Sequence, residues 1–111
     1  MEDIITVIQG TELKLRMEVN LGDIYLMDCE FEVTAYTNSK NKITIKKENC
    51  ITLDGDETAC FVPIDTSKIN TGTLILDIKL DIPDDDFTNV LNNDGNRTEI
   101  YRKKTNIKII V

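Results

Sequence analysis

The chain has 111 residues, the size of one domain, and its 20 acidic and 13 basic residues leave a net charge of −7. It contains no histidine and no tryptophan. Histidine-based acid–base catalysis, Ser-His-Asp or Cys-His nucleophiles and histidine-ligated metal sites are therefore excluded. An acidic chain is also a poor partner for the phosphates of DNA or RNA, so we expect no nucleic-acid binding. Ile, Val and Thr make up 35 of the 111 residues, which favours strands over helices.

Alternation of apolar and polar residues, typical of a strand with one buried face, recurs along the chain. In chain order the predicted strands are Ile4–Ile8, Thr11–Val19, Cys29–Tyr36, Lys42–Lys46, Cys50–Leu53, Thr58–Ile64, Thr73–Ile82, Arg97–Lys103 and Asn106–Val111. Strands with one apolar face are typical of antiparallel sheets packed against each other. The sequence predicts a single domain over residues 1–111, all-β, with the architecture of an immunoglobulin-like (Ig-like) antiparallel β-sandwich of about seven to nine strands.

One long connection, residues 83–96, interrupts the regular spacing of the predicted strands. Pro83 is expected to end the preceding strand, and Asp84–Asp86 to cap a single helical turn. Phe87, Val90 and Leu91 follow at helical spacing and give that turn a small apolar face. We expect these three residues to form a docking contact.

The same loop is rich in aspartate, because Asp84, Asp85 and Asp86 lie between Asp81 and Asp94. Carboxylates in a flexible loop suggest Ca²⁺. The EF-hand order is absent, however, and adjacent aspartates cannot all face one ion. A solvated, helix-capping loop is the preferred interpretation, and the sequence leaves calcium open without predicting a metal site.

Other chemistry receives little support from the residues. The three cysteines Cys29, Cys50 and Cys60 are an odd number without CxxC spacing, which indicates free thiols. A pair of glycosidase-like carboxylates could be chosen from 20 acids, but small sandwiches rarely enclose a cleft, and only three Phe and three Tyr are available to stack on a sugar. We expect no enzymatic activity, no cofactor and no small-molecule substrate.

Charge is unevenly distributed over the last third of the chain. Residues 77–94 carry six acids and one base, whereas residues 97–108 carry five bases and one acid. Two interpretations stay open: solvated edges whose lysines prevent aggregation, and complementary charge that brings subunits or a neighbouring protein into register. Arg102, Lys103 and Lys104 are the basic contact candidates.

Both ends of the chain carry apolar residues that strict alternation does not explain. The candidate contacts are Ile4, Ile5, Val7 and Ile8 at the start and Ile109, Ile110 and Val111 at the end. The last strand is either central in a sheet or added to a partner's sheet. We expect burial beyond one sandwich core, and therefore a homo-oligomer. No membrane partner is expected, because the opening residues are acidic and uncharged stretches are far shorter than the roughly 20 residues of a spanning helix.

Several short motifs resemble small Ig-like virion proteins of tailed phages. The opening segment 8–15 (IQGTELKL) is similar to the start of the N-terminal module of the baseplate upper protein. The second half resembles structural proteins of the crAss-like phage group through Asp65–Ser67, Gly72–Leu74, Ile82–Phe87, Asn96–Glu99 and Thr105–Ile109. The chain departs from that pattern in having Asp85 where serine is usual and in a longer insertion, Thr88–Asp94.

The resemblance implies a non-enzymatic structural protein of a tailed-phage virion, as a head fibre, capsid decoration or collar/tail adaptor. Such a protein would self-associate, dock onto other virion proteins and enter the virion after synthesis in the bacterial cytoplasm. It brings no catalytic residues. The alternative is a carbohydrate- or surface-binding adhesion module, which needs exposed aromatic residues on one face, whereas Tyr25, Tyr36 and Tyr101 are scattered along the sequence.

Overall fold

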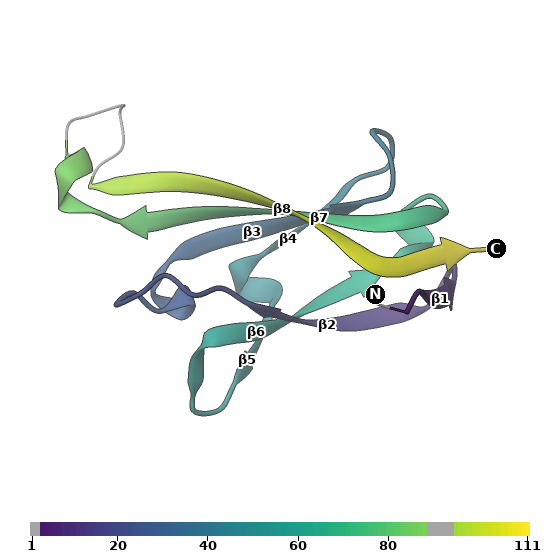
Figure 1. The fold of residues 1–111 in the computed structure, drawn as a ribbon, viewed down its shortest axis with the longest axis horizontal. Coiled ribbons are helices and arrows are strands. Elements are labelled where there is room, and N and C mark those ends of the chain that lie inside the picture. The colour runs from purple at the N-terminus through teal and green to yellow at the C-terminus, as the bar shows by residue number, and fades with distance from the viewer. Residues whose placement is uncertain (1–2, 89–94) are drawn as a thin grey trace.

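The computed structural model describes residues 3–88 and 95–111, which form eight strands and four short 3₁₀ turns (Figure 1). The strands are β1 (Ile5–Ile8), β2 (Glu12–Glu18), β3 (Glu30–Tyr36), β4 (Ile43–Lys46), β5 (Ile51–Leu53), β6 (Asp56–Asp65), β7 (Gly72–Pro83) and β8 (Asn96–Ile110). The 3₁₀ turns are η1 (Leu26–Asp28), η2 (Lys47–Asn49), η3 (Thr66–Lys68) and η4 (Asp85–Phe87). The predicted all-β class is confirmed.

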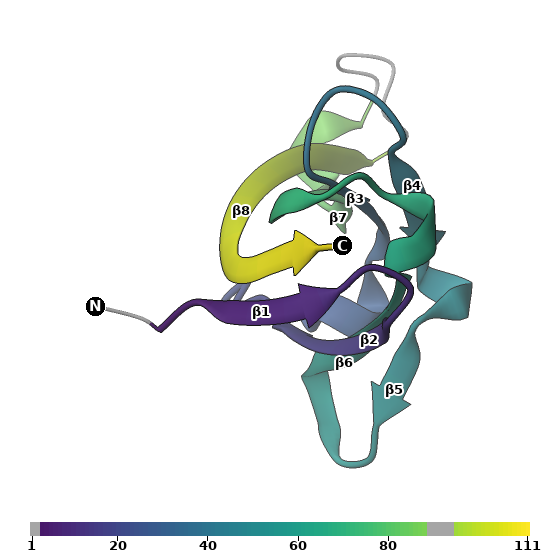
Figure 2. The same cartoon turned by 90° about the vertical axis from the view of Figure 1, so that its right-hand side faces the viewer.

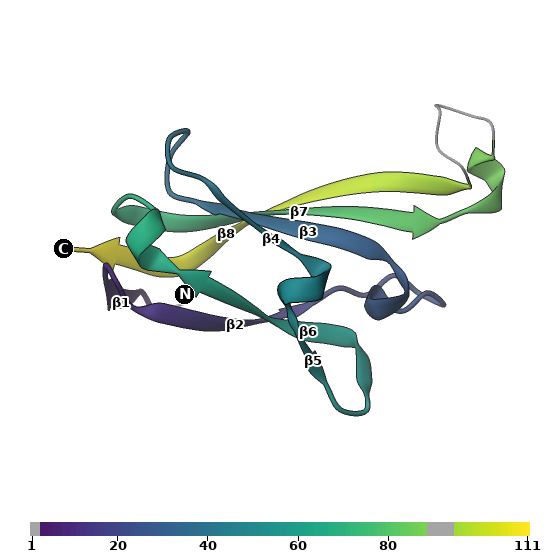
Figure 3. The same ribbon diagram turned by 180° about the vertical axis from the view of Figure 1, so that it is seen from behind.

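The strands form two sheets, a five-stranded one in the order β1-β8-β7-β3-β4 and a three-stranded one in the order β2-β6-β5. Consecutive strands are divided between the sheets as in an Ig-like sandwich, with one sheet built on the β3-β7-β8 group and the other on β2, β5 and β6. Figure 3 shows the β5–β6 hairpin projecting away from the larger sheet. The predicted β-sandwich is therefore confirmed.

One pairing differs from the predicted antiparallel arrangement. β1 runs parallel to β8, with Ile5 opposite Ile107 and Val7 opposite Ile109. Figure 2 shows β1 beside the curved end of β8, although the two lie at opposite ends of the sequence. β1 is the edge strand of the larger sheet, and the chain then crosses to β2 in the smaller sheet.

The chain's last two predicted strands form one continuous strand, β8. Its pairing with β7 shifts register between Thr73 and Ile75, at a bulge that β8 makes near Thr105. The Thr105 hydroxyl donates to the Leu74 carbonyl (2.8 Å) and accepts from the Ile107 amide (3.1 Å). These two bonds replace part of the interrupted ladder, so the irregular sequence around Thr105 bends the strand without ending it.

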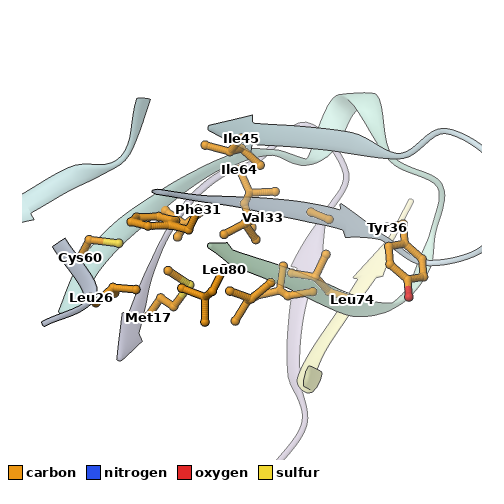
Figure 4. Close-up of a cluster of buried hydrophobic side chains, with 14 of the residues drawn as sticks. Met17, Leu26, Phe31, Val33, Tyr36, Ile45, Cys60, Ile64, Leu74 and Leu80 are labelled. Atoms are coloured by element: carbon orange, nitrogen blue, oxygen red, sulfur yellow. The ribbon is translucent and has the colours of Figure 1, made fainter. Parts of the chain in front are cut away.

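The core lies between the sheets and contains the apolar faces that the alternation predicted. Figure 4 shows Phe31 and Val33 of β3 and Leu80 of β7 beside Ile64 of β6 and Met17 of β2. Val33 and Leu80 are fully buried. Burying one such side chain stabilises the fold by about 1.5–3 kcal/mol, which identifies this cluster as the main source of stability.

Candidate assembly surfaces

The structure brings the two apolar ends of the chain together in one place, called here the terminal edge (Ile4–Ile8 with Ile107–Val111). β1 is the outermost strand of the larger sheet, so its outer side pairs with no strand in the described part of the chain. Ile4 is 71 % exposed, Ile8 63 % and Val111 94 %, and Ile5 is also exposed. Exposed isoleucines on an open strand edge are a hydrophobic surface of the kind that partners cover.

Not every predicted contact at this edge is available to a partner. Ile109 is fully buried and Ile107 nearly so, while Val7 and Ile110 are half-buried. The cause is that the end of β8 lies between β1 and β7, as the pairing of Ile109 with both Val7 and Gly72 shows. Of the two readings left open for the last strand, the central position applies, and Ile109 belongs to the core.

A hydrogen-bonded turn that the sequence did not reveal holds the terminal edge in place. The Thr66 side chain is fully buried, and its hydroxyl donates to the Thr11 carbonyl (2.7 Å) and accepts from the Gly10 amide (2.9 Å). The Gln9 side-chain amide donates to the carbonyl of Ile69 (2.7 Å). Gly10 has φ +105°, which only glycine adopts readily. A buried threonine after an aspartate is too common a pattern to mark this role in the sequence alone.

The acidic and basic stretches of the last third pair with each other inside the chain. β7 and β8 form a long antiparallel hairpin that extends beyond the other strands (Figure 1). The Arg102 Nε lies 2.9 Å from the Asp77 carboxylate, and Arg97 lies 2.6 Å from Asp84. Some of the acidic and basic residues that were candidates for contact with a neighbouring protein thus pair with each other within one protomer.

Asp77 is also the centre of a small polar cluster on the outer face of the larger sheet. The Tyr36 hydroxyl donates to the Asp77 carboxylate (3.0 Å), and the Lys42 ammonium lies 4.5 Å from the centre of the Tyr36 ring. Hydrogen bonds from Arg102 and Tyr36 lower the pKa of Asp77. Burial and the Asp77 carboxylate raise the pKa of Tyr36. The cluster therefore holds a charged carboxylate against a neutral phenol.

The three basic contact candidates do not share a face. In the β7–β8 register Arg102 lies opposite Asp77 and Lys103 opposite Leu76, so their side chains leave the sheet on opposite sides. Lys104, opposite the half-buried Ile75, lies on the same side as Arg102. All three residues are exposed, but they form two separate surfaces.

The predicted docking loop is described only in its first part. The Asp84 carboxylate accepts from the Asp86 amide (3.1 Å) and caps the short turn η4 (Asp85–Phe87). The predicted turn ran through Phe87–Leu91, most of which lies outside the described residues. Phe87 is half-buried, whereas Val90 and Leu91 lie outside the described residues. The Asp84 carboxylate also accepts a hydrogen bond from Arg97. Of the three adjacent aspartates, the one next to β7 is therefore already paired.

The described residues offer no metal cluster, no membrane-spanning helix and no platform of tyrosines. Among residues 3–88 and 95–111, no three His, Cys, Asp or Glu side chains gather closely enough to hold a metal ion, and Asp94 lies outside these ranges. Within the same ranges no helix is long and apolar enough to cross a bilayer. Tyr25 and Tyr101 are exposed, but Tyr36 is buried, so the three tyrosines form no common platform.

A groove opens between the two sheets on the side of β2 and of the part of β8 that β1 does not cover. It has a volume of about 450 Å³ and is lined by Leu15 and Met17 of β2, by Val19 just after β2, and by Leu76 and Ile78 of β7. Tyr101 and Lys103 of β8 line the same groove. The two sheets therefore leave an open, partly apolar groove on this side.

Searches of protein families, of curated proteins and of solved structures give no match to this chain.

Proposed function

We propose that the chain is a non-enzymatic structural protein of a tailed-phage virion, which self-associates and docks onto other virion proteins. The terminal edge is the observation that carries the proposal, because it gathers exposed apolar side chains from both ends of the chain at one open edge of the larger sheet. The phage setting is supported by the motif resemblance, and the building-block role by the sandwich fold with its open edges.

The terminal edge is suited to docking for a physical reason. An outermost strand presents unpaired backbone amides and carbonyls, and natural proteins usually protect such strands with charges or proline. β1 carries neither, since its sequence is Ile-Thr-Val-Ile. A partner strand laid along β1 would pair these backbone groups and cover Ile4 and Ile8 at the same time. The described residues favour this role over an adhesion module, because their tyrosines form no platform.

The experiment is recovery of the tagged chain with particles of the phage that encodes it. Wild-type protein is expected to co-purify with intact particles through a density gradient, as measured by quantitative mass spectrometry. Ile8→Lys is expected to be lost from the particles, because it places a charge in the apolar contact. Ile51→Lys, at an exposed isoleucine on β5 of the other sheet, is the matched control and should stay bound.

Thermal melts show whether both variants fold, and both should melt near the wild-type temperature because the two isoleucines are exposed. Absence of the wild-type chain from purified particles would refute the virion role. Equal retention of Ile8→Lys and wild type would refute the terminal edge as the docking surface.

A further inference from the structure

A second open edge lies on β8, next to the terminal edge. β1 pairs only with residues 107–110, so the earlier half of β8 pairs with β7 on one side and with no described strand on the other. We call the segment Thr98–Lys104 the β8 open edge. Its outward-pointing backbone groups are available to a further strand.

The side chains of the β8 open edge alternate between two faces. Glu99, Tyr101 and Lys103 lie opposite Leu80, Ile78 and Leu76, which places them on the side that faces the smaller sheet. Glu99 accepts hydrogen bonds from Tyr101 and from Arg97, which lower its pKa and keep it charged. Lys103 makes no ion pair within residues 3–88 and 95–111. One anion and one cation thus lie two residues to either side of an exposed tyrosine.

We infer that two copies of the chain pair antiparallel through their β8 open edges about a twofold axis at Tyr101, with Glu99 of each copy opposite Lys103 of the other. The inference rests on the self-association in the proposed function and assigns it an edge and a register. In this register Tyr101 faces its own counterpart, Thr98 lies opposite Lys104, and Ile100 lies opposite Arg102. Opposite charges meet twice, and no like charges are opposed.

Neighbouring registers lack this complementarity. Because antiparallel partners share a face, a twofold register is defined by its central residue. Centring on Ile100 places Arg97 opposite Lys103, centring on Glu99 opposes two glutamates, and centring on Arg102 opposes two arginines. Like charges directly opposite each other destabilise a strand pair. Among the registers centred on Glu99 to Arg102, the sequence of the edge therefore favours the one centred on Tyr101.

The groove beside this edge supports the same occupant. Tyr101 and Lys103 line it together with apolar residues of both sheets. A second copy paired at this edge would bring its own Tyr101 ring to the mouth of the groove, over Leu76 and Ile78. The interface would then join backbone pairing and ion pairs to the burial of apolar surface.

The test uses charge reversal on full-length chains and sedimentation velocity over a concentration series. Lys103→Glu and Glu99→Lys each turn two attractive pairs into two repulsive ones, so each should raise the dimer dissociation constant about 10-fold or more. Mixing the two single variants should restore the wild-type dissociation constant within about 3-fold, because both cross-strand pairs of the mixed dimer again join opposite charges. A mass tag on one variant identifies the mixed dimer.

Lys40→Glu, in the exposed turn between β3 and β4, is the control that matches Lys103→Glu in its change of net charge, and it should dimerise as wild type does. Recovery of the mixed dimer also shows that both variants fold. A wild-type dimer insensitive to the reversals, or no recovery on mixing, would overturn the inference. A wild-type chain that stays monomeric would also overturn the inference. If that monomeric chain still enters particles, the proposed virion role is retained. A dimer with the expected charge response but no particle binding would instead refute the virion role alone.

Discussion

Asp77 and Arg102 lie directly opposite each other on β7 and β8, with the Arg102 Nε 2.9 Å from the Asp77 carboxylate. They belong to the acidic and basic stretches that are separate in the sequence and adjacent in the hairpin. Tyr36 adds a hydrogen bond to the same carboxylate from the neighbouring strand β3. Part of the charge of the β7–β8 hairpin is therefore paired within the hairpin itself.

Replacement of Asp77 by Asn should make stability less dependent on acid pH. The pKa of Asp77 is lower in the folded chain, so its contribution is complete above the unfolded value of about 3.9 and is lost as the pH falls through the folded value. Thermal melts should show wild type more stable than Asp77→Asn at pH 7, with the difference shrinking below about pH 4. Asp54→Asn, at the exposed β5–β6 turn, is the control, and a constant difference between wild type and Asp77→Asn from pH 7 to pH 3 would contradict the linkage.

Removal of the Thr105 hydroxyl should destabilise the bend of β8. Thr105→Val keeps the shape of the side chain but leaves the Leu74 carbonyl and the Ile107 amide without their partner. We expect a loss of about 1–3 kcal/mol in the free energy of unfolding, measured by urea denaturation. Thr98→Val removes an exposed hydroxyl from the same strand and should change stability by less than about 0.5 kcal/mol. Equal effects of the two variants would show that the bend does not depend on Thr105.

The three thiols should react at different rates in the folded chain. Burial and the neighbouring Cys50 thiol raise the pKa of Cys60 to about 12, and burial raises the pKa of Cys29. At pH 8 the thiolate fraction of Cys60 is then only about one in ten thousand. Mass spectrometry after brief iodoacetamide treatment should find label first on the half-buried Cys50, and on all three cysteines in guanidinium. Labelling of Cys60 as fast as Cys50 in the native chain would contradict this burial.

The strands were largely predictable because their alternation is local. The β7 segment, for example, carries Leu74, Leu76, Ile78, Leu80 and Ile82 on one face, and all five are buried. The parallel pairing of β1 was not predictable, because nothing in the sequence Ile-Thr-Val-Ile shows where the other end of the chain lies. The continuity of β8 was missed because a bulge interrupts the pattern that defines a strand.

The residues that make the candidate contacts could be predicted individually from the sequence, but the surfaces that they form could not. Ile4 and Ile8 are exposed as expected, whereas Ile109 is in the core because β8 is flanked on both sides at its end. The charge asymmetry of residues 77–108 was visible in the sequence. Its partial neutralisation by Asp77–Arg102 and Asp84–Arg97 depends on the register of the hairpin, which only the fold supplies.

Assembly through open strand edges is tested most directly by hydrogen–deuterium exchange of the wild-type chain at low and high concentration. Amides that point outward from an open edge exchange quickly, and pairing with a second strand protects them. We expect concentration-dependent protection in Thr98–Lys104 or in β1, and none in the outermost strands β4 and β5. Exchange in both segments that does not change with concentration would contradict self-association through these edges.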